Sequence, residues 1–294
     1  MKSSFSVLSA DPAAKKTIML GSRQTTGRRD THINSVTAVR LRSANSLSCG
    51  YQPDRSAKET AVTVEITDPA ANHLLAALSR ADFTELKALL KQVTLEQGVV
   101  LQEPGEEVEQ IYFPHDGMVS LLAVMKDGRA IETATVGAEG VVGVMAGIGL
   151  HIALTRAVVQ LPLVASKISA TGFRKAVQSS NTLRNLVVRA NDALLAQVQI
   201  TAACNALHTI EARLARWILQ SSDRSRSAAL PLTQELLSQM LGVTRSSVSE
   251  VAGRLQAAGL IRYVRGNIEI VDRRALEKTA CECYGSLRLA SVLL

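Results

Sequence analysis

The stretch from residue 230 to residue 271 limits the fold of this chain more than any other, because it holds the signals for two short helices and a hairpin in succession. Thr233 and Thr244 are good N-caps, and apolar residues at helical spacing follow each of them. Between the two helices Gly242 permits a tight turn, and Gly259 predicts a left-handed end to the second helix. Alternating apolar residues then predict a β-hairpin. This order of elements is that of a winged helix-turn-helix.

The second helix of this stretch separates into a buried side and an outward side. Val248, Val251 and Leu255 recur at steps of three and four and predict the buried side. An α-helix fits the major groove of DNA, and its N-terminal side chains reach base edges. Arg245 falls in the first turn, where a guanidinium can donate two hydrogen bonds to guanine. The predicted DNA-binding residues of this helix and the following hairpin are Thr244, Arg245, Ser246, Ser249, Glu250, Arg254 and Arg265.

The same stretch resembles the C-terminal domain of the Crp/Fnr transcription regulators, the relatives of the cyclic-AMP receptor protein. Residues 207–219 (LHTIEARLARWIL) resemble the helix that leads into that domain, and residues 112–120 (YFPHDGMVS) resemble a stretch of the family's sensor roll. The positions that read bases in the family are matched here by Arg245, Ser246, Ser249 and Glu250. The resemblance implies a sequence-specific transcription regulator that binds double-stranded DNA as a homodimer, with RNA polymerase as a candidate partner.

From residue 93 to residue 167 the pattern changes from helix to strand. Short apolar runs are separated by turn residues, and Asp127-Gly128 between two such runs is a strong hairpin signal. Several short strands at this spacing predict an antiparallel barrel or roll. With the resemblance, the expected fold is α+β: a jelly-roll-like β-roll of the cyclic-nucleotide-binding type, a long dimerisation helix and a winged helix-turn-helix. The expected divisions are a disordered basic tail (1–65), the roll with flanking helices (66–175), the dimerisation helix (176–206), the DNA-binding domain (207–280) and a C-terminal tail (281–294).

An apolar stripe in the expected dimerisation helix needs a partner surface. In the family the corresponding helix pairs with its twin about a two-fold axis, whereas packing on the chain's own roll would give much the same pattern. Paired recognition helices about 34 Å apart match successive turns of one DNA face, which favours the dimer. The predicted dimerisation residues are Leu183, Val187, Ala190, Leu194 and Val198.

In the family a cyclic nucleotide is held by a Gly-Glu pair and, about ten residues on, by an Arg that precedes a small residue and Ala. Alignment on the surrounding glycines and on Ala157 places that Glu at Val142 and that Arg at Thr155. Glu139 and Arg156 are the displaced candidates for effector binding. A one-residue shift turns a strand side chain to the opposite face, which disfavours cyclic AMP and leaves the effector open.

The charge and the cysteine content of the chain indicate its class of partner and its cellular compartment. The net charge of +7 and a basic C-terminal end suit a sensor joined to a polyanion-binding module. Four cysteines in 294 residues do not suggest a secreted disulfide framework, so a reducing cytoplasm is expected. Cys281-x-Cys283 is spaced too tightly for a usual zinc pair, and Cys49 alone in the N-terminal third does not support the iron–sulfur cluster of the Fnr branch. Cys204 is interpreted as a small core residue and His208 as a packed or capping residue. We therefore expect no metal and no cofactor.

Sequence motifs for common enzyme classes are missing: no nucleophile elbow, phosphate-cradling loop or H-E-x-x-H occurs. No apolar run reaches the roughly 18–20 residues that cross a bilayer. We expect no catalytic residue and no membrane partner. The alternative function is a signalling or scaffold module whose roll binds a small molecule or protein and whose winged helix makes protein contacts. DNA affinity with a steep salt dependence separates the two functions.

Overall fold

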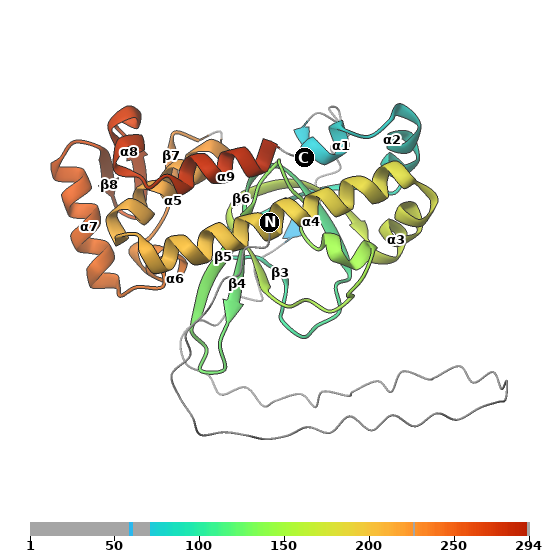
Figure 1. Ribbon diagram of the computed structural model, residues 1–294, viewed down its shortest axis with the longest axis horizontal. Helices are drawn as coiled ribbons and strands as arrows, with labels where there is room; N and C mark the ends of the chain where they lie inside the picture. Colours follow the sequence, from blue (N-terminus) through green and yellow to red (C-terminus); the bar gives the residue numbers. More distant parts are fainter. Residues whose placement is uncertain (1–58, 61–70, 226, 293–294) are drawn as a thin grey trace, which may run out of the picture. The chain divides into compact units, whose positions relative to one another are not determined.

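The computed structural model describes residues 59–60, 71–225 and 227–292. The expected basic tail, residues 1–65, lies outside the described residues apart from Glu59–Thr60, which form β1. Within the described part, a β-roll is followed by helices and a small C-terminal sheet (Figure 1). No helix of the described part is both long and apolar enough to cross a bilayer.

The roll is a six-stranded antiparallel sheet in the order β1-β2-β6-β4-β5, with β3 beside β6. Its further strands are β2 (Lys91–Leu95), β3 (Val100–Gln102), β4 (Gln110–Val124), β5 (Ala130–Val136) and β6 (Arg156–Ser169). Asp127-Gly128 forms the expected turn between β4 and β5, and Gly128 has a φ of +85°. The predicted antiparallel roll is therefore confirmed.

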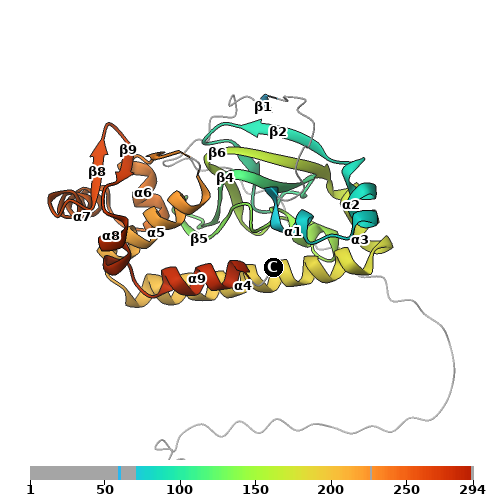
Figure 2. The ribbon, with the colours of Figure 1, turned by 90° about the horizontal axis from the view of Figure 1, so that it is seen from above.

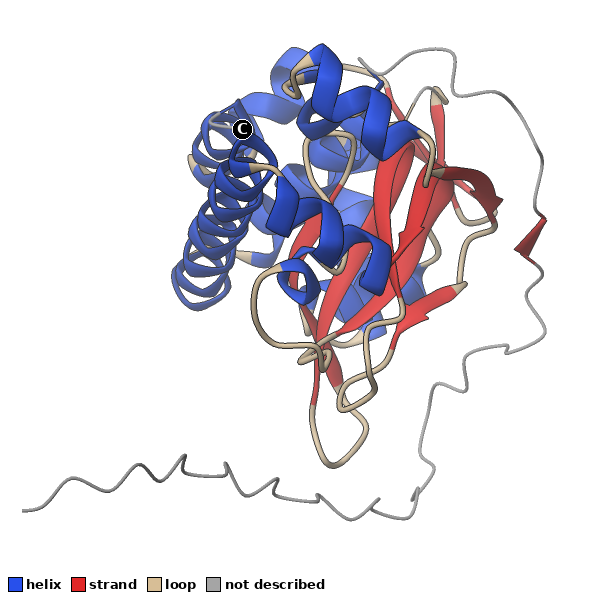
Figure 3. Cartoon of the chain, turned by 90° about the vertical axis from the view of Figure 1, so that its right-hand side faces the viewer, coloured by secondary structure: helices blue, strands red, loops and turns tan. Residues whose placement is uncertain are grey.

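Short helices cover the ends of the roll. Before it come α1 (His73–Ala76) and α2 (Arg80–Lys87), the 3-10 helix η2 (Val144–Gly147) lies between β5 and β6, and α3 (Ala170–Ser179) follows β6. Ser180 then caps α4 (Asn181–Leu207), and Thr209 caps α5 (Ile210–Arg224). In Figure 2, α4 runs along the roll, and Figure 3 shows the helices gathered on one side of its strands.

The C-terminal part is the expected winged helix-turn-helix. Its sheet has the order β7-β9-β8. Its elements are β7 (Ala229–Pro231), α6 (Gln234–Leu241), α7 (Arg245–Ala257), β8 (Ile261–Val264), β9 (Asn267–Ile270) and α8 (Arg273–Thr279). The expectation of a C-terminal tail over residues 281–294 is wrong, because most of these residues form α9 (Cys283–Val292), which packs against α4 (Figures 1 and 2).

Trp217 of α5 joins the two parts in one core. Trp217 is 1% exposed and belongs to a cluster that includes Met118 and Leu161 of the roll and Leu237 of α6. The indole N–H donates to Glu132 Oε1 on β5 at 2.7 Å. A polar bond at the centre of an apolar cluster fixes the orientation of α5 on the roll.

Candidate nucleic-acid interface

The turn between α6 and α7 has the local geometry that the sequence predicts. The side-chain oxygens of Thr233 and Thr244 each accept the backbone N–H three residues further on, at 3.2 Å. Gly242 has a φ of +64°, in the left-handed region that favours glycine. A Cβ on Gly242 would come 2.7 Å from Ile131 Cδ1 of the roll. The positive φ favours glycine at this turn, and a larger residue would also displace the end of the Ile131 side chain on β5.

The predicted buried side of α7 is confirmed. Val248, Val251 and Leu255 are buried in the core that α7 shares with α5 and α6. This packing turns the first turn of α7 outward, and Arg245 is exposed there. Gly259, with a φ of +73°, follows the end of α7 as predicted.

The wing is a tight hairpin between β8 and β9. Val264 pairs with Asn267, so the turn contains Arg265 and Gly266 alone. Their φ values are +49° and +78°, which two-residue hairpin turns require. The Tyr263 hydroxyl donates to the Leu232 carbonyl at 2.8 Å and holds the wing against the start of the domain.

Arg245 and Arg265 line one groove of about 330 Å³ between the first turn of α7 and the wing. The other lining residues are Thr233, Gln234, Tyr263 and Gly266. Two cationic side chains on one concave surface, with tyrosine and a helix N-terminus beside them, suit contact with phosphates and with base edges.

The remaining predicted DNA-binding residues lie on α7 and its N-cap. Arg254 donates to Glu250 Oε1 at 2.6 Å and to Glu211 Oε2 at 3.0 Å. These bonds hold the guanidinium between Glu250 of α7 and Glu211 in the first turn of α5. Of the seven predicted residues, Ser249 is partly buried, and the exposed ones are Thr244, Arg245, Ser246, Glu250, Arg254 and Arg265.

The two candidate effector residues pair with protein groups in separate places. Glu139 Oε1 accepts hydrogen bonds from Arg224 Nε at 2.8 Å and Nη2 at 2.5 Å. Burial raises the pKa of Glu139, but the charge and hydrogen bonds of Arg224 outweigh it and hold the pKa below its usual range. Arg156 donates to Glu103 Oε2 at 2.9 Å. The structure does not bring Glu139 and Arg156 together on one ligand-sized site.

Two family models match the chain. A cyclic nucleotide-binding domain matches residues 92–180, and a Crp-like helix-turn-helix domain matches residues 212–279. Together they cover more than half of the sequence, in the order that the roll and the helix-turn-helix have in the structure. The chain belongs to the Crp/Fnr family.

Solved Crp/Fnr structures share this fold. A regulator of the CRP/FNR family from Thermus thermophilus is 23% identical, with a TM-score of 0.54 over 65% of this chain and 98% of that one. A CRP family regulator from the same organism is 23% identical, with a TM-score of 0.55 over 64% and 95%. The c-di-GMP responsive regulator CLP of Xanthomonas campestris is 16% identical, with a TM-score of 0.55 over 66% and 100%. Among proteins of curated function, none matches this sequence.

The apolar stripe of α4, the counterpart of the Crp/Fnr dimerisation helix, packs on the chain's own roll. Leu183, Val187 and Ala190 are buried in a cluster with Phe113 and Phe173. Leu194 and Val198 pack against a second cluster of roll residues. Within one chain, Leu183, Val187 and Ala190 are therefore buried by the roll, whereas Leu194 and Val198 are only partly buried. The apolar stripe is accounted for by packing on the roll, and the role of these residues in a dimer stays a prediction.

Two buried polar links between the roll and α5 were missed by the sequence analysis. They are the bond of Glu132 to Trp217 and the ion pair of Glu139 with Arg224. Each joins residues 85 positions apart. Local periodicity carries no information on such a pairing, so the only available signal was acidic residues next to apolar strand positions.

Proposed function

We propose that this protein is a sequence-specific DNA-binding transcription regulator that acts as a homodimer, with the roll as its signal-input domain. The observation that carries the proposal is the exposed first turn of α7, with Arg245 facing the same groove as Arg265 of the wing. In this account Arg245 enters the major groove and donates to guanine, while Arg265 contacts phosphate. Glu250 would accept from a cytosine amino group, and Arg254 positions it through their 2.6 Å bond.

The dimer would use the face of α4 that points away from the roll. Val188, Leu195 and Ala202 are exposed and recur every seven residues. A seven-residue repeat is the spacing at which two helices can pack along a common seam. These exposed residues lie about a quarter turn or more around the axis of α4 from the predicted dimerisation residues. A dimer formed through them would leave the packing of α4 on the roll unchanged.

Replacing Arg245 with alanine should weaken specific DNA binding by about 1–3 kcal/mol and relax the preference at one base position. Non-specific binding should change little, because most of it comes from phosphate contacts. The DNA site is first selected from a random pool of duplexes by the wild-type protein. The measurement is a gel-shift titration of wild type and variant on that site and on single-base variants of it.

Arg80→Ala is the matched control, since Arg80 is an exposed arginine on α2, far from α7 in Figures 1 and 2. It should bind like wild type. An Arg245→Ala protein with unchanged base preference would reject the base-reading role. A folded wild-type protein without DNA affinity in low salt would favour the signalling or scaffold module instead.

A further inference from the structure

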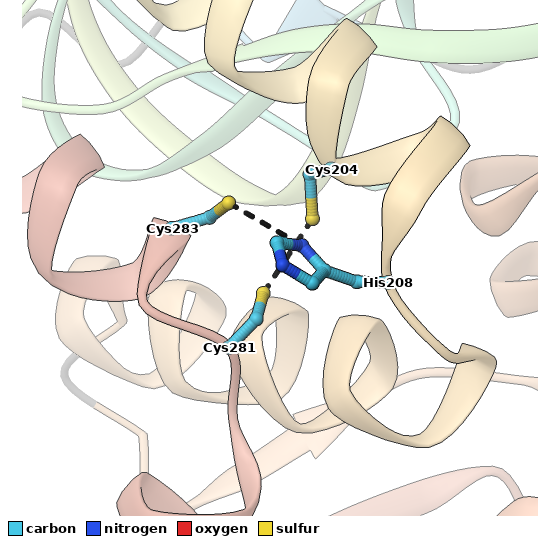
Figure 4. A group of neighbouring side chains, drawn as sticks. All are labelled: Cys204, His208, Cys281 and Cys283. Atoms are coloured by element: carbon cyan, nitrogen blue, oxygen red, sulfur yellow. Dashed lines mark hydrogen bonds between the residues drawn. The ribbon is translucent and has the colours of Figure 1, made fainter.

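Four side chains with metal-ligating atoms converge where α4 ends and α9 begins (Figure 4). Cys204 is in the last turn of α4, and His208 is its C-cap. Cys281 lies between α8 and α9, and Cys283 is the first residue of α9. One ligand atom from each residue lies within 4.8 Å of all the others, and the three cysteines are buried. We call this group the Cys3His cluster.

The spacing of the ligand atoms fits a single tetrahedral ion. Two sulfurs bound to one zinc at about 2.3 Å lie about 3.8 Å apart, and a sulfur and a nitrogen lie about 3.6 Å apart. Here Cys204 Sγ and Cys281 Sγ are 3.5 Å apart, and Cys283 Sγ and His208 Nδ1 are 3.6 Å apart. A disulfide would need about 2.05 Å. The four ligands of a [2Fe–2S] or [4Fe–4S] cluster are divided among two or four iron atoms, so the set as a whole would spread further than this.

The orientation of His208 also suits a ligand. Its Nδ1 faces Cys283, while its Nε2 lies 3.2 Å from Glu282 Oε1. Ligating histidines commonly donate their second ring N–H to a carboxylate, which fixes the tautomer and orients the ring. His208 and Glu282 have this relation within the Cys3His cluster.

The surroundings match the charge of such a site. Three thiolates and a neutral imidazole around a divalent ion carry a net charge of −1. Arg213 and Arg216 of α5 are 6% and 4% exposed, and both interact electrostatically with Cys204. These buried guanidiniums would offset the negative charge of the site.

We propose that Cys204, His208, Cys281 and Cys283 bind one zinc ion. Three thiolates and one imidazole form a closed, tetrahedral ligand set of the kind that zinc occupies in structural sites. The Cys281-x-Cys283 spacing is too tight for a usual zinc pair by itself, but Cys204 and His208, four residues apart at the end of α4, complete the ligand set. The ion would tie α9 to the joint between α4 and α5, where the sensor meets the DNA-binding domain.

The direct test is the metal content of the full chain. Protein purified without oxygen is loaded with zinc, separated from unbound metal and analysed by elemental mass spectrometry. We expect about one zinc per chain. Loading with cobalt(II) should produce the visible absorption of a tetrahedral cobalt centre together with thiolate charge-transfer bands. Absence of retained zinc, or a disulfide between Cys204 and Cys281 in the oxygen-free protein, would overturn the proposal.

Amino-acid substitutions distinguish the metal ligands from residues that do not bind the metal. Cys283→Ser should weaken zinc binding by at least about 100-fold, and Glu282→Gln by about 10-fold, because a neutral amide oxygen supports the ligating imidazole of His208 less than a carboxylate does. Glu282 is 78% exposed, so its substitution tests the site without threatening the fold. Cys49→Ser is the control for thiol number and should retain full zinc. Equal zinc affinity in Glu282→Gln and Cys283→Ser relative to wild type would contradict the assignment.

Discussion

Replacing Glu139 with alanine should lower the free energy of unfolding by about 3 kcal/mol, because it leaves the Arg224 guanidinium without its counter-charge. The Glu139 and Arg224 side chains are 16% and 10% exposed, which places the effect at the lower end of the range for buried pairs. Gly137 packs closely against the same arginine, since a Cβ there would lie 2.6 Å from Arg224 Cδ. Urea unfolding at neutral pH measures the change as a shift of the midpoint at constant slope.

The double variant Glu139→Ala/Arg224→Met is the control for this expectation. It removes the uncompensated charge and keeps the apolar stem, so it should be more stable than Glu139→Ala. The coupling energy of the two substitutions then gives the contribution of the pair. A single variant as stable as wild type, or a double variant that loses the sum of both single effects, would contradict the role of the pair.

Raising the pH from about 4.5 to about 7 should lower the stability of the wild type by roughly 3 kcal/mol through Glu132. Burial raises the pKa of Glu132 from 4.5 to about 7, although hydrogen bonds from Ser120 and Trp217 act in the opposite direction. The folded state then retains a proton that the unfolded chain releases near pH 4.5. The stabilisation is complete below the unfolded pKa and is lost as the pH rises through the folded pKa.

Glu132→Gln isolates this effect from all other titrations. Its side-chain oxygen can still accept the Trp217 N–H, but it cannot ionise. The difference in unfolding free energy between the two proteins should therefore change across pH 4.5–7 and stay constant above that window. A difference that is the same at every pH would show that Glu132 titrates alike in the folded and unfolded chain.

The local features of this protein could be predicted from its sequence. Thr233, Gly242 and Thr244 define the helix-turn-helix within a dozen positions, and Asp127-Gly128 defines the long hairpin of the roll. In each case the signal is a helix-capping residue or a glycine that permits a positive φ. Such residues determine the backbone conformation of their immediate neighbours, so they can be recognised in the sequence.

The long-range features could not be predicted in this way. The stripe of Leu183, Val187 and Ala190 shows that α4 has an apolar partner, but the identity of that partner depends on how the roll is placed. Cys204 and Cys281 are 77 residues apart and meet only because α9 folds back along α4. Amphipathic periodicity indicates that one face of a helix is buried, but it does not indicate which surface buries that face.

In the proposed complex, the exposed turn of α7 reads DNA in two symmetry-related copies. Selection of bound duplexes from a random pool by the purified full chain tests it most directly. We expect a two-fold-symmetric consensus whose half-sites are centred about 10–10.5 base pairs apart or at a multiple of that spacing. Enrichment of no sequence by a folded protein at low salt, or of a single asymmetric half-site, would contradict it.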